Sequence, residues 1–317
     1  MNIFVFSLPL LYILGSAICT YALPLRPIIG VLAQGSSSSI KKYGSSYIAA
    51  SYIKFLESAG ARVVPILVNQ TDEYYGNIFK SVNGILFPGG GADIVDDVSR
   101  VGYSGAAHIL YHLAVQANKQ GDFFPLWGIC LGFEELMIQT AGTDVLIEGI
   151  EAHNVSFPIH LEPGFEDSRL LNKKTTPPSI IHTLTTVNST LNSHSMGVTP
   201  ANFTKFPALS SFFRVLSTNH DLNGVKFIST VEAYDFPFYG TQWHPEKNAF
   251  EWKVNSCHSK ECVELMQFLA NFFVEEARKN QHQFSSAEEM AKFLIYNYQP
   301  IDLSQSSSFF EQAYFFQ

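Results

Sequence analysis

Charged side chains are scarce in this chain of 317 residues: Asp, Glu, Lys and Arg make up 15% of it, whereas 46% is hydrophobic. The net charge is −8 with the histidines neutral, and no block of lysine or arginine is present. Because proteins bind nucleic acid through clustered basic side chains, no nucleic-acid partner is expected. The apolar content is ample for one large core, so we expect residues 23–317 to form a single domain.

Long hydrophobic runs are absent beyond the N-terminus, where no stretch reaches the ~18 apolar residues that a membrane helix requires. No membrane association is therefore expected for the mature chain. Residues 1–22 differ, because Ile3–Leu14 is almost wholly apolar, small residues follow it, and the first charged side chain is Arg26. This pattern predicts a secretory signal peptide cut near Ala22, although a basic leading segment is missing. A short membrane anchor is the alternative.

Cysteine is rare as well, with four in the chain, and Cys19 falls within the predicted signal peptide. The remaining Cys130, Cys257 and Cys262 cannot form a disulfide framework. Cys257 and Cys262 either close a small loop, or Cys262 is a buried apolar residue on a helix. Cys130 is left over, as suits a reactive thiol. No group of His or Cys has the spacing of metal ligands, so neither a metal nor another cofactor is expected.

Asn-x-Ser/Thr sequences, which can accept N-linked glycans, occur at Asn69, Asn154, Asn188 and Asn202. Each is weak evidence by itself, because such sequences arise by chance. Beside a signal peptide they predict a glycoprotein of the secretory pathway.

The first half of the chain alternates between strand-like and helix-like segments. Strands are predicted at Pro27–Ala33, Arg62–Leu67, Gly84–Phe87 and Phe124–Trp127. Helices are predicted at residues 47–58, 72–82 and 105–119, where apolar residues recur at helical spacing. This alternation predicts an α/β fold: a doubly wound, mostly parallel central sheet with helices on both faces.

The second half is less regular. Short β-like runs, among them residues 180–184 and 225–230, should extend the sheet or cover one of its edges. Residues 264–280 form an amphipathic pattern that predicts a long helix on the sheet. One more helix is expected after Ser285, and the polar residues 304–308 are interpreted as a surface loop.

The segment Gly128-Ile129-Cys130-Leu131-Gly132 follows a predicted strand and opens a predicted helix. This is the pattern of a nucleophile elbow, a turn so tight that both flanking positions require glycine. The thiol would stand at a helix N-terminus, which favours the thiolate. A lone cysteine is more often an ordinary core residue, but this frame favours a catalytic nucleophile.

Two further segments can complete such a site. His244 ends an apolar strand and could act as a base, while Glu246 could orient its ring. A structural histidine and a solvated surface carboxylate are the alternatives, and His194 and His220 are other candidate bases. The loop Pro88–Gly91 should lie near Cys130, since sites in open α/β sheets form at the carboxyl ends of strands. Backbone N–H groups of Gly90 or its neighbours and of Leu131 could then hold an oxyanion.

These segments resemble those of a known superfamily. Residues 87–90, 127–134 and 242–246 look like the class I glutamine amidotransferases, and residues 47–52, 57–65 and 227–230 more closely resemble the γ-glutamyl hydrolase family. The resemblance covers nearly the whole mature chain. It implies Cys130 as nucleophile, His244 as general acid and base, Glu246 as the third member of the triad, and His194 near the substrate.

The resemblance further implies a peptidase, secreted or lysosomal and usually dimeric, that removes γ-linked glutamates from folate and antifolate polyglutamates. Such substrates are anionic, as is this chain, although protonation of its ten histidines in an acidic compartment would reverse the net charge. One rival function is a glutaminase subunit that releases ammonia from glutamine. A secreted binding protein that kept the fold without activity is the other.

Overall fold

The computed structural model describes residues 25–94, 101–306 and 308–317. The predicted signal peptide, with Cys19, lies outside the described residues. Within the described ranges, no helix combines the length and the apolar character of a membrane span.

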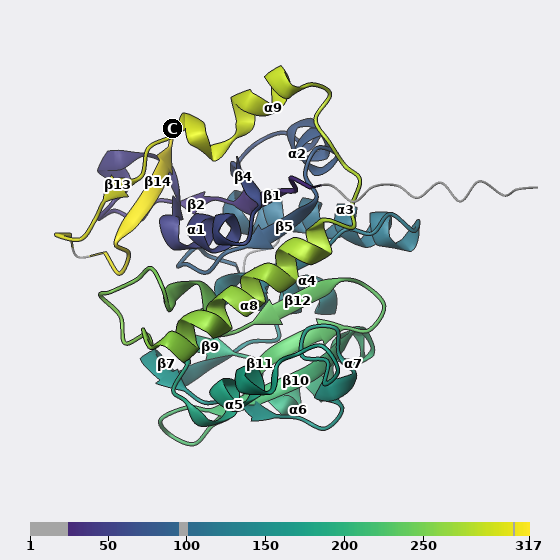
Figure 1. The fold of residues 1–317 in the computed structure, drawn as a ribbon, viewed down its shortest axis with the longest axis vertical. Coiled ribbons are helices and arrows are strands. Elements are labelled where there is room, and N and C mark those ends of the chain that lie inside the picture. Colours follow the sequence, from purple (N-terminus) through teal and green to yellow (C-terminus); the bar gives the residue numbers. More distant parts are fainter. Residues whose placement is uncertain (1–24, 95–100, 307) are drawn as a thin grey trace, which may run out of the picture.

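The centre of the molecule is an eight-stranded sheet in the order β4-β1-β5-β6-β12-β11-β10-β8 (Figure 1). Five neighbouring strands pair in parallel, namely β4 (Arg62–Ile66), β1 (Ile28–Leu32), β5 (Gly84–Phe87), β6 (Leu126–Ile129) and β12 (Phe238–Thr241). Three strands continue the sheet in antiparallel pairing, namely β11 (Lys226–Ala233), β10 (Phe213–His220) and β8 (His160–Leu161). The predicted doubly wound, mostly parallel sheet is confirmed, and the β-like run 225–230 extends it.

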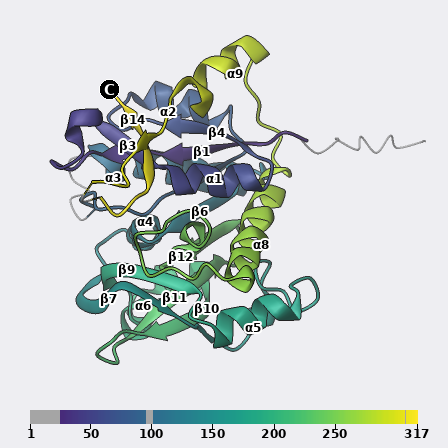
Figure 2. The same cartoon turned by 60° about the vertical axis from the view of Figure 1, so that its left-hand side comes forward.

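The sheet separates two apolar cores because successive side chains of a strand point to opposite faces. In β1, Ile28 and Leu32 enter one core, whereas Ile29 and Val31 enter the other. The first core is covered by α2 (Asp72–Phe79), α3 (Gly102–Lys119), α4 (Leu131–Ala141), α6 (Pro200–Lys205) and α7 (Pro207–Phe212). The second is covered by α1 (Ala50–Ser58), α5 (Pro178–Thr186) and the long α8 (Lys260–Ala277), which crosses the molecule in Figures 1 and 2.

Two predicted elements were wrong. Residues 180–184 belong to helix α5 and not to a strand, since a proline starts the helix and Ile180, Thr183 and Leu184 form its buried face. Residues 47–49 belong to strand β3 (Ser46–Ala49), and helix α1 begins only at Ala50. The partner of β3 is β14 (Gln312–Phe316), which lies so far along the chain that local periodicity could not indicate the pairing.

Two small sheets flank the central one. The C-terminal strand β14 lies between β3 and β13 (Ile301–Asp302), with β2 (Gln34–Gly35) at the other edge of β3. Strands β7 (Ile147–Phe157) and β9 (Thr190–Gly197) form a separate antiparallel pair. The expected helix after Ser285 is α9 (Ala287–Phe293).

The structure shows which cysteines are bonded and which one is free. Cys257 and Cys262 form a disulfide across the N-terminus of α8, which resolves the two alternatives. Cys130 is a free, buried thiol.

Candidate active site

Three adjacent parallel strands direct their carboxyl ends to one edge of the sheet. The loop Pro88–Gly91 follows β5, Cys130 follows β6, and the segment Gln242–Glu246 follows β12. Sites of open α/β sheets form at this edge, as the sequence predicted.

Cys130 stands on a strained turn. Its φ is 53° and its ψ is −109°, a combination that a side-chain-bearing residue rarely adopts. A Cβ built on Gly132 would lie 2.0 Å from the carbonyl oxygen of Phe87, and one on Gly128 would lie 2.3 Å from the carbonyl oxygen of Gly132. Both flanking positions therefore require glycine, as expected for a nucleophile elbow.

His244 follows β12 at the start of a single 3-10 turn, Pro245–Lys247. Its Nδ1 lies 2.8 Å from Oε1 of Glu246, and both side chains are buried. Because a carboxylate only accepts hydrogen bonds, Nδ1 carries the proton and donates it to Glu246. Nε2 is then the ring nitrogen that is left to exchange a proton with another group.

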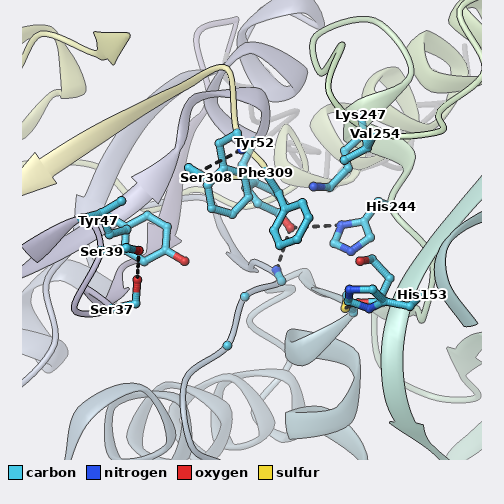
Figure 3. Close-up of a pocket in the computed structure, with 17 residues that line it drawn as sticks. Ser37, Ser39, Tyr47, Tyr52, His153, His244, Lys247, Val254, Ser308 and Phe309 are labelled. Atoms are coloured by element: carbon cyan, nitrogen blue, oxygen red, sulfur yellow. Dashed lines mark hydrogen bonds between the residues drawn. The ribbon is translucent and has the colours of Figure 1, made fainter. Parts of the chain in front are cut away.

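Gly89 is the point at which the imidazole and the thiol meet. A Cβ built on Gly89 would lie 2.7 Å from Cε1 of His244, 2.7 Å from the hydroxyl oxygen of Tyr52 and 3.0 Å from Cβ of Cys130. The Tyr52 hydroxyl accepts a hydrogen bond from the Gly89 N–H at 2.8 Å and lies 3.3 Å from Nδ1 of His244 (Figure 3). The fold thus brings Cys130, His244 and Glu246 together, and it adds Tyr52, which the sequence analysis missed.

The glycine loop is held by a side chain from β2. The amide of Gln34 donates to the carbonyl oxygen of Gly89 at 2.8 Å and accepts from the N–H of Gly91 at 3.1 Å. A Cβ on Gly90 would lie 1.8 Å from Oε1 of Gln34, so a larger residue there would force the Gln34 amide out of this position. The N–H of Gly89 donates to Tyr52 and that of Gly91 donates to Gln34, whereas the N–H of Gly90 has no acceptor among the described residues.

The ionisation of the nucleophile differs from the expectation. Burial, followed by the neighbouring Glu134, raises the pKa of the Cys130 thiol, although Lys247 and then the Leu131 N–H act in the opposite direction. Burial also lowers the pKa of His244, against the opposing effect of Glu246. The resting pair is therefore a neutral thiol beside a neutral imidazole. A position at a helix N-terminus does not by itself produce a thiolate when the group is desolvated.

Cys130 lies between two hollows. The larger, of about 380 Å³, is lined by His244, Tyr52, Lys247 and the C-terminal residues Ser308, Phe309 and Phe310. The polar tail that the sequence analysis interpreted as a plain surface loop therefore leads directly into one wall of the site (Figure 3). This tail reaches the site because the C-terminal strand β14 pairs with β3 from the first part of the chain.

The smaller hollow, of about 230 Å³, contains His194 and Glu134 beside Cys130. Nδ1 of His194 lies 2.7 Å from the carbonyl oxygen of Met196, and burial lowers the pKa of this ring to about 4. Burial raises the pKa of Glu134 to about 8, and the Gln242 amide donates to its Oε1 at 2.9 Å. His194 is thus near the nucleophile, as the resemblance implied, whereas His220 lines neither hollow.

No group of three or more His, Cys, Asp or Glu side chains suited to a metal ion occurs in the part of the chain that the structure describes.

An elbow cysteine with a histidine–carboxylate pair on a doubly wound sheet defines the class of cysteine hydrolases that work through acyl transfer. The comparisons with known proteins specify the family. The model of the peptidase C26 family matches residues 27–246, and the chain belongs to this family.

Among similar proteins, the human protein named gamma-glutamyl hydrolase is 44% identical, over 92% of this chain and 90% of its own length. Gamma-glutamyl hydrolase B of Dictyostelium discoideum is 40% identical, over 96% of this chain and 87% of its own length. A solved structure of a glutamine amido transferase from Methylobacillus flagellatus matches with a TM-score of 0.47 at 12% identity, covering 82% of this chain and 97% of that one.

Proposed function

We propose that this protein is a γ-glutamyl hydrolase that cleaves the γ-linked glutamates of folate and antifolate polyglutamates. The observation that carries the proposal is the convergence of Cys130 and His244 at Gly89, with Glu246 behind the imidazole. The relatives named gamma-glutamyl hydrolase supply the bond type, a γ-glutamyl amide.

In the first step, His244 Nε2 takes the proton of the Cys130 thiol as Sγ attacks the γ-carbonyl carbon. Because the resting pair is neutral, this proton transfer accompanies the attack. The carbonyl oxygen becomes an oxyanion, for which the N–H groups of Gly90 and Leu131 are the donors. Glu246 stabilises the imidazolium that forms.

The tetrahedral intermediate then collapses. The C–N bond breaks, the nitrogen of the departing glutamate takes the proton from His244, and a γ-glutamyl thioester remains on Cys130. Water attacks the thioester with His244 as base, the C–S bond breaks, and the thiol regains its proton. Each turnover consumes one water and needs no cofactor.

A glutaminase is the alternative, since the glutamine side-chain amide is the same type of bond and only the leaving group differs. Ammonia is smaller than an amino acid and needs no hollow of its own. The hollow of about 380 Å³ on the His244 side of the nucleophile favours a larger leaving group. An inactive binding protein would not need the strained turn at Cys130 that the fold maintains.

We further propose that the protein is secreted or lysosomal and forms a homodimer. Support for the location comes from the signal-peptide pattern and the glycosylation sequences, and support for the dimer comes from the family resemblance alone. Light scattering of the mature protein at several concentrations tests the dimer.

The experiment that tests the function is mass analysis of the products from a γ-linked oligoglutamate at acidic and neutral pH. Stepwise loss of glutamate, or release of shorter γ-linked oligomers, is expected for the active protein. Release of ammonia from glutamine together with an intact oligoglutamate would favour the glutaminase instead.

A further inference from the structure

Lys247 is a buried cation that faces the larger hollow. Its side chain belongs to the same 3-10 turn as Glu246, and the residue is only 4% exposed. It is the only lysine or arginine among the described residues that line this hollow. Figure 3 shows its amine directed toward the space between Phe309 and His244.

The ammonium group has no hydrogen bond or salt bridge to another described residue. Its Nζ lies 5.1 Å from the centre of the Phe310 ring, a cation–π contact that holds the cation without neutralising it. Glu251 couples to Lys247 electrostatically, but the two side chains form no salt bridge or hydrogen bond, and Oε2 of Glu251 accepts the backbone N–H of Glu311 at 2.7 Å. A buried ammonium without a bonded anion is unfavourable, which indicates that an anion occupies the hollow during function.

Lys253, by contrast, is a lysine of this region with a structural role. Lys253 Nζ donates to the carbonyl oxygens of Leu303, Ser306 and Ser308, and it thereby anchors the C-terminal segment. Lys247 has no such set of acceptors among the described residues, and its contact with the wall of the hollow is the one with the Phe310 ring.

The position of His244 identifies which part of the substrate occupies this hollow. His244 lines the larger hollow and not the smaller, and it protonates the amine that leaves. The leaving residue therefore occupies the larger hollow, and the acyl residue the smaller. In a γ-linked glutamate, the α-carboxylate of the leaving residue is two bonds from its nitrogen.

We propose that Lys247 binds the α-carboxylate of the leaving glutamate and so determines that the leaving group is an α-amino acid. This proposal rests on the proposed function. A charge-assisted contact in a buried site discriminates strongly against a substrate that lacks the anion, because the ammonium then stays unpaired. The same residue would give no advantage to ammonia as a leaving group.

The test compares two substrates that share the acyl part, an N-(4-aminobenzoyl)-γ-glutamyl group. One carries glutamate as the leaving residue, and the other carries 4-aminobutyrate, which lacks only the α-carboxylate. We expect the wild-type protein to favour the first by about 10- to 100-fold in kcat/KM. Lys247 also lowers the pKa of Cys130 and of His244, so Lys247→Met should change the rate on both substrates by a common factor. Beyond that factor it should slow the glutamate substrate alone and so lose the preference, whereas Lys247→Arg should keep most of it.

Lys226→Met is the matched control, because Lys226 is half exposed and pairs with Glu162 away from both hollows. It should leave both rates within about twofold of wild type. Unchanged wild-type preference in Lys247→Met, or an equal loss on both substrates, would overturn the role of Lys247 while leaving the hydrolase intact. If wild-type protein cleaves neither substrate, the proposed function itself fails. Should Lys247→Met unfold, Lys247→Gln provides the same comparison.

Discussion

Nδ1 of His244 lies 2.8 Å from Oε1 of Glu246, and the Glu246 side chain is completely buried. The two residues are separated only by Pro245, so their contact is local in the chain. This contact sets the tautomer of the ring and leaves Nε2 for the thiol. Burial lowers the pKa of this imidazole, and Glu246 opposes that effect.

Replacement of Glu246 by glutamine should test this contact. The amide keeps the shape of the side chain but removes the charge that raises the pKa of His244. We expect kcat/KM to fall roughly 100-fold or more, since the ring is no longer held in one tautomer. The acidic limb of the pH profile should move to lower pH. Glu162→Gln, on a partly buried carboxylate that pairs with Lys226 away from both hollows, is the control, and an unmoved acidic limb in Glu246→Gln would contradict the assignment.

The glycine loop offers a matched pair of substitutions. A methyl group on Gly90 would collide with the Gln34 amide, whereas one on Gly91 would meet no atom within 4 Å. Gly90→Ala should therefore push the Gln34 amide out of its contacts with Gly89 and Gly91, release the loop that carries the oxyanion donor, and lower kcat by about 100-fold. Gly91→Ala should remain within about twofold of wild type. Equal activity of the two variants would show that the Gly90 N–H does not contact the oxyanion.

Glu134 should make the folded state less stable as the pH rises. Burial raises its pKa to about 8 in the folded protein, from an ordinary value of 4.5. The folded state therefore holds the proton more tightly, and its contribution to stability, complete below pH 4.5, is lost as the pH rises toward 8. Glu134→Gln should remove this loss, by at most about 1.4 kcal/mol for each pH unit in that window. Denaturant unfolding at pH 4.5 and pH 8 measures it; an equal effect of the substitution at both values would contradict the shift.

The glycosylation sequences should differ in occupancy. Asn188 is exposed at the end of α5, whereas Nδ2 of Asn202 donates to the carbonyl oxygen of Val145 at 3.1 Å. A glycan on Asn202 would have to displace or crowd this contact. Glycopeptide mapping of protein from a secretory host should find Asn188 modified and Asn202 largely unmodified. The reverse order of occupancy would refute this argument.

The parts of the site that the sequence predicted are local in the chain. The glycines around Cys130 and the spacing of His244 and Glu246 each lie within one short segment. Alternating strands and helices were enough to place the glycine loop and Cys130 at the same edge of the sheet, whereas the role of His244 was predicted from triad logic and the family resemblance. The two predicted elements that were wrong, at residues 47–49 and 180–184, are short apolar runs whose periodicity is ambiguous between strand and helix.

What the sequence did not reveal depends on contacts between distant segments. Tyr52 and Gln34 meet the glycine loop only in the folded chain, and Phe310 reaches Lys247 only because β14 pairs with β3. The ionisation of Cys130 was mispredicted for a related reason. Its helix position can be read from the sequence, whereas the burial that raises its pKa cannot.

The most direct measurement of the mechanism is intact-protein mass spectrometry after acid quench of the protein mixed with N-(4-aminobenzoyl)-γ-glutamylglutamate. We expect an adduct of the N-acylated γ-glutamyl group, located by peptide mapping on the peptide that contains Cys130. Cys130→Ala should show neither adduct nor turnover, with a fall in rate of about 10,000-fold or more and an unchanged circular dichroism spectrum. Turnover by folded Cys130→Ala protein, or an adduct on another residue, would contradict the assignment of Cys130 as the nucleophile.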